Sequence, residues 1–416
     1  MRPAHRPRVA FFDYPDVFED FYPHYGVSQH TFATRWAGSG SHAILALVQR
    51  EIGDVVWYEF SLAPELAEAR HALGWTVRFL PSSTLHRAVW RAFYRPRIAW
   101  RWRAAYPAYA RVASYVALLS RPFWRALERE RPDVLFAQDY ATGRFDVLAL
   151  LARRLGIPLV AYHSGSQASR HHGRLVKRWS LRAARWLLVT SADEAGMLAS
   201  RYGVARERLL PMLTPIDTGA FSPRDRGAAL RDAGLDPARR YLLFVGRLDD
   251  GVKRVSALIR AFTVVAREHA DADLVIMGDG PDRSALERLA AGPPGRIRFV
   301  GWVDDVAAKA RFCAGAECVV LPSLNEGFPT VVGEAMACGT PVLASRVGAV
   351  PEMVVDGRTG WLWAPGDDVA LLRRLGEALA RPERLRAMRP AARAMAEARV
   401  APAVVLETLR RCLSVN

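Results

Sequence analysis

The stretch VVLPSLNEGFPTVVGEAMACGTPVLA, from Val319 to Ala344, decides how this chain can fold. It begins with a short apolar run that ends at a proline, which predicts a buried strand over residues 319–321. A loop follows over 323–327, and the pattern from Phe328 to Ala337 predicts a helix with Pro329 in its first turn. Residues 342–344 begin another strand. This order of strand, helix and strand indicates a parallel α/β unit.

Two glutamates frame the start of the predicted helix. Glu326 lies in the loop before it and Glu334 lies two turns into it, with seven residues between them. A helix N-terminus offers unpaired N–H groups and a partial positive charge, so it suits a phosphate. Carboxylates accept hydrogen bonds from hydroxyl groups, so two acids beside a phosphate suit a sugar and a ribose. Taken alone, the same spacing also describes two solvated surface glutamates.

The whole unit resembles the E-x7-E segment of the retaining glycosyltransferases of family 4, from the P-S-x-x-E-G-F-P lead to the E-A-M-A-C-G-T-P-V tail. The resemblance implies a nucleotide diphosphate sugar as donor, with its sugar hydroxyls held by Glu326 and its ribose hydroxyls by Glu334. The donor-binding residues that it implies in this segment are Glu326, Gly327, Phe328, Pro329, Thr330, Val331 and Glu334.

Length and composition are those of a globular protein. The chain has 416 residues, of which 51% are hydrophobic and 24% charged, and this length predicts two domains. No apolar run approaches the length of a membrane span, and the start MRPAHRPRVAFF lacks the apolar core of a signal peptide. The four cysteines show no C-x-x-C spacing, which is typical of reduced thiols. We therefore expect a cytoplasmic protein.

Short apolar runs alternate with helical patterns along the rest of the chain. Strands are expected over 9–12, 43–48, 55–60, 76–80, 133–137, 158–162, 187–190, 241–245, 273–277 and 298–300. Helices are expected over 29–36, 64–73, 147–155, 191–202, 255–266 and near 403–416. This alternation indicates parallel sheets with crossover helices.

His163 stands at the carboxyl end of the strand expected over 158–162, where doubly wound sheets bind their ligands. A loop histidine bonded to backbone is the alternative. The resemblance implies that His163 faces the donor sugar. It also implies a glycine-rich loop after the first strand, and there the chain offers the single Gly26. Both residues are taken as acceptor-side candidates.

A loop with two cations follows the strand expected over 241–245. Gly246 allows a tight turn and the close approach of a ligand. Arg247 and Lys253 can both reach one diphosphate, the arginine by a planar fork and the lysine as a point charge. The segment resembles the family's G-R…K-G, whose two cations hold the donor diphosphate. Arg254 stands where glycine is usual.

Two further turns complete the donor site that the resemblance implies. Gly278 would approach the diphosphate or ribose, and backbone groups around Val303 would hold the base. Asp249 and Asp250 are adjacent acids beside two bases, a pattern that is more often solvated than metal-binding. No metal and no other cofactor is therefore expected, because the two cations would supply the charge that a divalent ion provides elsewhere.

The basic residues are unevenly spread over a chain of net charge +16. Residues 85–131 hold 11 arginines against Glu128 and Glu130, together with several tryptophans. One interpretation is peripheral contact with an anionic membrane, or with an acidic or lipid-linked acceptor. The alternative is solvated arginine-rich helix faces with aromatic side chains in the core. No nucleic acid is expected, because no motif for its recognition is present.

The sequence thus predicts two doubly wound Rossmann-like α/β domains facing a cleft, the GT-B arrangement. Residues 1–215 would bind the acceptor, 216–399 would bind the nucleotide sugar, and a helix over about 400–416 would return to the first domain. The implied function is metal-independent, retaining transfer of the sugar to a glycan, lipid-linked or small-molecule acceptor. An epimerase of nucleotide sugars with the same architecture, and a catalytically silent nucleotide-sugar-binding protein, are the alternatives.

Overall fold

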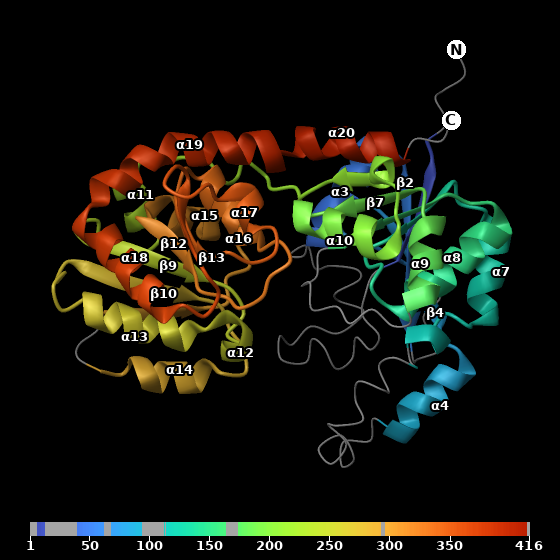
Figure 1. Ribbon diagram of the computed structural model, residues 1–416, viewed down its shortest axis with the longest axis horizontal. Helices are drawn as coiled ribbons and strands as arrows, with labels where there is room; N and C mark the ends of the chain where they lie inside the picture. Colours follow the sequence, from blue (N-terminus) through green and yellow to red (C-terminus); the bar gives the residue numbers. More distant parts are fainter. Residues whose placement is uncertain are drawn as a thin grey trace. The chain divides into compact units, whose positions relative to one another are not determined.

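The computed structural model describes residues 6–12, 40–61, 68–93, 112, 114–163, 174–292 and 296–413. The chain divides into two compact units, each built on its own sheet (Figure 1). The first unit comprises Met1–Met212 and Leu406–Asn416, and the second comprises Leu213–Val405. None of the described helices combines the length and the apolar character that a bilayer crossing requires.

The described strands of the first unit form one eight-stranded sheet. They are β1 (Arg8–Phe12), β2 (Asp54–Ser61), β3 (Ala69–Arg70), β4 (Thr76–Pro81), β5 (Val134–Ala137), β6 (Leu159–Tyr162), β7 (Trp186–Val189) and β8 (Leu209–Pro211). Their order is β3-β4-β2-β1-β5-β6-β7-β8, and every neighbouring pair is parallel except β3 with β4. The chain order reverses between β1 and β5, which is where doubly wound sheets place a ligand.

Helices flank this sheet. They are α3 (Gly40–Glu51), α4 (Thr84–Phe93), α7 (Arg121–Glu130), α8 (Gly143–Leu155), α9 (Arg174–Ala183), α10 (Ala192–Tyr202), the 3-10 turn η2 (Arg206–Arg208) and α20 (Pro402–Leu413). The hydroxyl of Ser191 accepts a hydrogen bond from the Glu194 N–H and so caps α10. The last helix is tied to the first unit, because Arg410 ion-pairs with Glu51 at 3.7 Å and Arg411 lies 5.3 Å from the Trp186 ring.

The second unit has a parallel six-stranded sheet in the order β11-β10-β9-β12-β13-β14. The strands are β9 (Arg240–Val245), β10 (Ala272–Met277), β11 (Ile297–Gly301), β12 (Cys318–Leu321), β13 (Val342–Ser345) and β14 (Gly360–Trp363). The order 3-2-1-4-5-6 is that of the dinucleotide-binding fold, with its switch point between β9 and β12. Loops that follow these two strands therefore meet at one edge.

Helices cover both faces of the second sheet (Figure 1). They are α11 (Arg226–Asp232), α12 (Asp250–Lys253), α13 (Val255–Val265), α14 (Arg283–Ala290), α15 (Val306–Gly315), α16 (Thr330–Ala337), α17 (Val350–Met353), α18 (Asp368–Ala380) and α19 (Pro382–Val400). Helix α13 packs against α14 and α18, whereas α16 packs against α15 and α19. The expected fold class, two α/β units with parallel doubly wound sheets, is confirmed.

Three local expectations are wrong. The apolar run 43–48 is part of helix α3, because Ile44, Leu45 and Val48 are buried on one helical face rather than in alternation. Within the stretch 64–73, expected to be helical, residues 69–70 form strand β3 on the sheet edge. Helix α16 begins at Thr330 instead of Phe328, since Pro329 is its extended N-cap. The helix expected over 29–36, and Gly26, lie outside the described residues.

Candidate functional site

An ion pair between Lys253 and Glu326 marks the switch point of the second sheet. Lys253 ends α12 after β9, and Glu326 lies in the loop after β12. Their Nζ and Oε1 atoms are 2.5 Å apart, and the Ser323 hydroxyl donates to the same Oε1 at 2.7 Å. The side chains are 19% and 9% exposed. The sequence assigns these two residues to different parts of the donor, and the structure adds that they bond directly to each other.

Glycines let the loops of this edge pack backbone against backbone. Gly278 has φ +144°, and a Cβ there would lie 1.9 Å from the carbonyl oxygen of Gly246. Gly348 has φ +52°, and a Cβ there would lie 2.1 Å from the Glu326 carbonyl oxygen and 2.4 Å from that of Gly327. Only glycine fits at such contacts. Gly278 is therefore packed against Gly246, and Gly348 against the Glu326–Gly327 loop.

The start of α16 lies directly after the Glu326 loop. Thr330 and Val331 form the first turn, so their N–H groups are among those that an α-helix leaves without an intrahelical partner. Phe328 is buried at 6% exposure, and the carbonyl of Gly327 accepts a hydrogen bond from the Ala349 N–H at 2.8 Å. The segment 326–331 thus holds a carboxylate beside a helix N-terminus.

Glu334 is buried two turns further along the same segment, and only half of its carboxylate is satisfied. Its Oε1 accepts from Lys309 Nζ at 2.7 Å, and the residue is 6% exposed. Its Oε2 has no hydrogen-bond partner among the residues that the structure describes. A buried acceptor without a donor is unfavourable, so a hydroxyl group that reached it would be stabilised. No spacing in the sequence singled out Lys309.

Arg247 and Arg254 flank Lys253 in the loop that follows β9. Arg247 is partly buried, and the next residue, Leu248, donates its N–H to the Asp279 carbonyl at 2.9 Å. This bond joins the loop to the turn after Gly278. Arg254 takes the left-handed conformation, φ +53° and ψ +40°, where the resembling family has glycine. Its guanidinium binds both carboxylate oxygens of Asp368, at 2.6 and 2.7 Å.

Val303 lies between β11 and α15 and is partly buried against the core of the second unit. Within the described stretches, no group of three or more His, Cys, Asp or Glu side chains could hold a metal ion. The second-unit candidates thus gather around the ends of β9, β10, β11 and β12, at one edge of one sheet.

His163 belongs to the first unit and follows β6, as expected. Its Nδ1 lies 2.8 Å from Oδ1 of Asp139, which follows the neighbouring strand β5. Burial raises the pKa of the Asp139 carboxyl, but the hydrogen bond and charge of His163, the Ala141 N–H and the Lys177 charge together leave that pKa below its ordinary value. Sequence reasoning missed Asp139. The rule that carboxyl ends of adjacent parallel strands meet could have found it.

A buried polar network surrounds this pair. The Tyr140 ring lies 5.1 Å from the His163 ring, and the Tyr140 hydroxyl donates to Glu194. Lys177 is fully buried, 2.8 Å from Asp146, and it donates to the carbonyl oxygen of Tyr140 at 2.9 Å. These contacts hold the loop that carries Asp139, and so they fix the orientation of the histidine.

Comparisons with known proteins cover both units. The family profile for glycosyltransferase family 4 matches residues 55–219, and the profile for group 1 glycosyl transferases matches residues 239–381. A D-inositol 3-phosphate glycosyltransferase of Actinosynnema mirum is 32% identical over 291 residues, which are 62% of this chain and 69% of the relative. The chain belongs to glycosyltransferase family 4. In this family-4 chain, Glu326 is bonded to Lys253 and Glu334 is bonded to Lys309.

Other relatives match the family-4 chain over a smaller share of their length. The sulfoquinovosyl transferase SQD2 of Arabidopsis thaliana is 30% identical over 299 residues, 68% of this chain but 57% of the plant protein. Among solved structures, sucrose-phosphate synthase of Thermosynechococcus elongatus has a TM-score of 0.70 at 20% identity and covers 98% of both chains. Anabaena HepE in complex with UDP has a TM-score of 0.69 at 16% identity and covers 98% of this chain and 99% of the HepE chain. These two share the GT-B fold with this chain.

Proposed function

We propose that this chain transfers a sugar from a nucleotide diphosphate sugar to an acceptor, with retention of the anomeric configuration and without a metal. The observation that carries the proposal is the Lys253–Glu326 pair beside the start of α16. A cation, a carboxylate and a helix N-terminus converge there at the switch point of a dinucleotide-binding sheet.

The charges account for the bond that breaks. Cleavage of the bond between the anomeric carbon and phosphate oxygen leaves the electron pair on the diphosphate. Arg247, Lys253 and the N–H groups of Thr330 and Val331 would stabilise that charge as it develops, which is where catalysis arises. Lys253 would then share its charge between Glu326 and the phosphate. We assign no metal, because these groups supply the positive charge.

The two glutamates would hold the donor by its hydroxyl groups. Glu326 would accept hydrogen bonds from the sugar, since its carboxylate is already oriented by Ser323. Glu334 would accept from the ribose, since its Oε2 is a buried acceptor with no partner among the described residues. Gly246, Gly278 and the backbone at Val303 would approach the diphosphate and base.

His163 would orient the transferred sugar, with its ring held by Asp139. For retention, the acceptor hydroxyl would attack from the side on which the diphosphate leaves, and its proton would pass to the leaving phosphate oxygen. No separate protein base is assigned. Solved neighbours that contain UDP support a nucleotide in the donor. The relatives are named for different sugars and acceptors, so the acceptor is left open among glycan, lipid-linked and small-molecule classes.

One experiment tests the function against its alternatives. The protein is mixed with candidate nucleotide sugars, and nucleotide release is measured with and without candidate acceptors. Acceptor-dependent release supports transfer, whereas interconversion of free donor without release would indicate an epimerase. Binding without either reaction would indicate a silent binding protein. Anomeric NMR of the product then tests retention, and an unchanged rate with chelator tests metal independence.

A further inference from the structure

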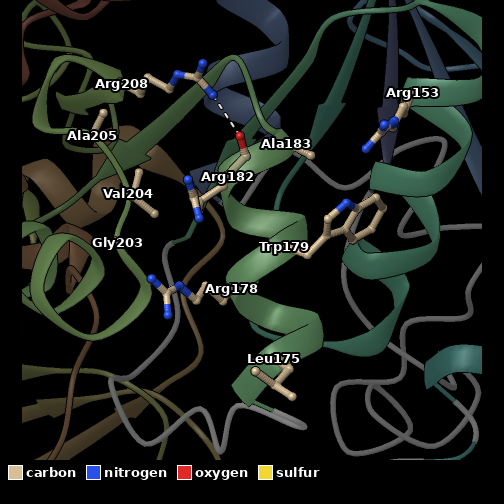
Figure 2. Close-up of a pocket in the computed structure, with 10 residues that line it drawn as sticks. All are labelled: Arg153, Leu175, Arg178, Trp179, Arg182, Ala183, Gly203, Val204, Ala205 and Arg208. Carbon is tan, nitrogen blue, oxygen red and sulfur yellow. Dashed lines mark hydrogen bonds between the residues drawn. The ribbon is translucent and has the colours of Figure 1, made fainter.

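A basic pocket of about 520 Å³ lies on the outer side of α9 in the first unit (Figure 2). Its walls come from α8, α9, the turn after α10 and η2. The donor chemistry proposed above uses none of its residues.

Four arginines line the pocket, and none of its described lining residues is acidic. Arg178 and Arg182 stand one helical turn apart on α9, and Arg153 comes from the last turn of α8 (Figure 2). The guanidinium groups of these three arginines make no hydrogen bond or ion pair with any residue that the structure describes, and all three are exposed. Arg208 differs, because it donates to the Arg182 carbonyl at 2.7 Å and so holds η2 against the end of α9.

Like charges at i and i+4 on a helix repel each other, and no described acid in the pocket offsets them. An anion between Arg178 and Arg182 would remove that repulsion. Gly203 lies beside this pair, since a Cβ added there would be in van der Waals contact with the Arg178 guanidinium at 3.7 Å. Guanidinium groups present paired N–H donors that match the oxygens of a phosphate.

Apolar side chains stand next to the arginines. Leu175 is 82% exposed, and Trp179 is half-buried on the same wall. One face of α9 carries all four side chains, because each lies three or four residues from another of them along the helix: Leu175, Arg178, Trp179 and Arg182. A ligand that combines a phosphate with a carbon skeleton matches this arrangement better than a bare ion does.

The position of the pocket separates it from the strand ends that carry His163 and Asp139. Arg182 and Ala183 come just before β7, and the Gly203–Ala205 turn comes just before β8. The arginine-rich end of the pocket is thus at the amino edge of the sheet, whereas Asp139 and His163 follow the carboxyl ends of β5 and β6. A ligand here would leave that carboxyl edge free.

We propose that this pocket is a binding site for a phosphate ester, with its phosphate held by Arg178 and Arg182 and its carbon part against Leu175 and Trp179. The phosphate belongs either to a soluble ester or to the headgroup of an anionic lipid. The site is separate from the one assigned to the donor diphosphate, and it is occupied independently of the donor.

The test uses two double variants of the full chain. Arg178→Ala with Arg182→Ala removes two of the four arginine charges that line the pocket. Arg121→Ala with Arg125→Ala is the matched control, because it removes two exposed arginines at the same spacing from α7. In the soluble arm, glycerol 1-phosphate is titrated by calorimetry into the parent and into each double variant. All of these proteins also carry Arg247→Ala, so that binding at the donor site contributes little to the measured heat. In the lipid arm, the parent and each double variant are sedimented with phosphatidylcholine vesicles that contain or lack phosphatidylglycerol.

The pocket variant is expected to lose binding roughly ten-fold or more in at least one arm, because two charge-assisted contacts are removed. The α7 variant is expected to bind as the parent does. Loss in the soluble arm assigns a soluble ester, and loss in the lipid arm alone assigns a lipid headgroup. The proposal is overturned if neither arm shows binding, if both variants weaken equally, or if only the α7 variant loses vesicle binding. Any of these results leaves the donor proposal untouched, since that is read from nucleotide release.

Discussion

The ion pair between Lys253 and Glu326 leads to a prediction in which the effect of a substitution on stability differs from its effect on catalysis. Replacing Lys253 with methionine keeps the aliphatic length but leaves the Glu326 carboxylate, 9% exposed, with the Ser323 hydroxyl as its remaining donor among the described residues. Breaking a buried ion pair by removing one partner costs about 3–5 kcal/mol. The lysine is 19% exposed, so water reaches part of the pair, and we expect a cost of about 2–3 kcal/mol.

The measurement is a double-mutant cycle of thermal unfolding. Lys253→Met should lower the unfolding midpoint by roughly 4–12 °C, since a unit of this size shifts by about 2–4 °C per kcal/mol. Glu326→Gln removes the charge of the partner and keeps its shape. The double variant should therefore be more stable than the sum of the two single changes implies, with a coupling of about 1–3 kcal/mol.

Activity should behave differently in the same four proteins. If Lys253 stabilises the leaving diphosphate, its loss should lower kcat by roughly 100- to 1,000-fold, as the loss of one preorganised charge or donor does. The coupling that makes the double variant more stable than the sum of the single changes should not restore that rate. Additive stability changes would show that the pair is not coupled in solution. A Lys253→Met protein that transfers sugar at the parent rate would refute the diphosphate assignment.

Three further predictions concern other groups. Burial and the nearby Arg144 charge lower the pKa of His86 to about 4, against about 6.5 unfolded. The neutral form is thus favoured in the fold, and stability should fall by up to about 3 kcal/mol as the pH drops from 6.5 to 4; urea unfolding of His86→Leu should lack this slope. Burial raises the pKa of the Cys338 thiol to about 12, so a thiol reagent at pH 8 should label it only after unfolding, and rapid native labelling would contradict the structure. Gly348→Ala should destabilise the protein by about 2–4 kcal/mol, because its Cβ meets two backbone oxygens; an unchanged unfolding midpoint would exclude that contact.

The sequence predicted the elements of the second unit better than those of the first. The segments around Glu326 and Lys253 combine strong turn residues with apolar strands, so local signals suffice there. The run Ala43–Val48 is apolar at almost every position, and such a run does not distinguish a strand from one face of a helix. Tertiary packing decides it, and no local pattern contains that information.

The contacts within the site were harder to predict than its residues. Lys253 and Glu326 are 73 positions apart, and Lys309 and Glu334 are 25 apart. The first pairing depends on strand order, which brings β9 and β12 together across the switch point, and the second depends on the packing of α15 against α16. Sequence patterns identified which groups carry charge near a loop, but the partner of each charge follows only from the three-dimensional fold.

The left-handed backbone at Arg254 makes the conformation of the loop that ends at Lys253 sensitive to ionic strength. A non-glycine residue in this conformation costs about 1 kcal/mol, and the two hydrogen bonds from one guanidinium nitrogen of Arg254 to the Asp368 carboxylate offset that cost. The Asp368 side chain is 57% exposed, so dissolved ions screen the attraction. Concentrated salt would thus weaken the Arg254–Asp368 ion pair, which holds the loop next to Lys253. It would also weaken the binding of an anion to Lys253, and the two effects would add.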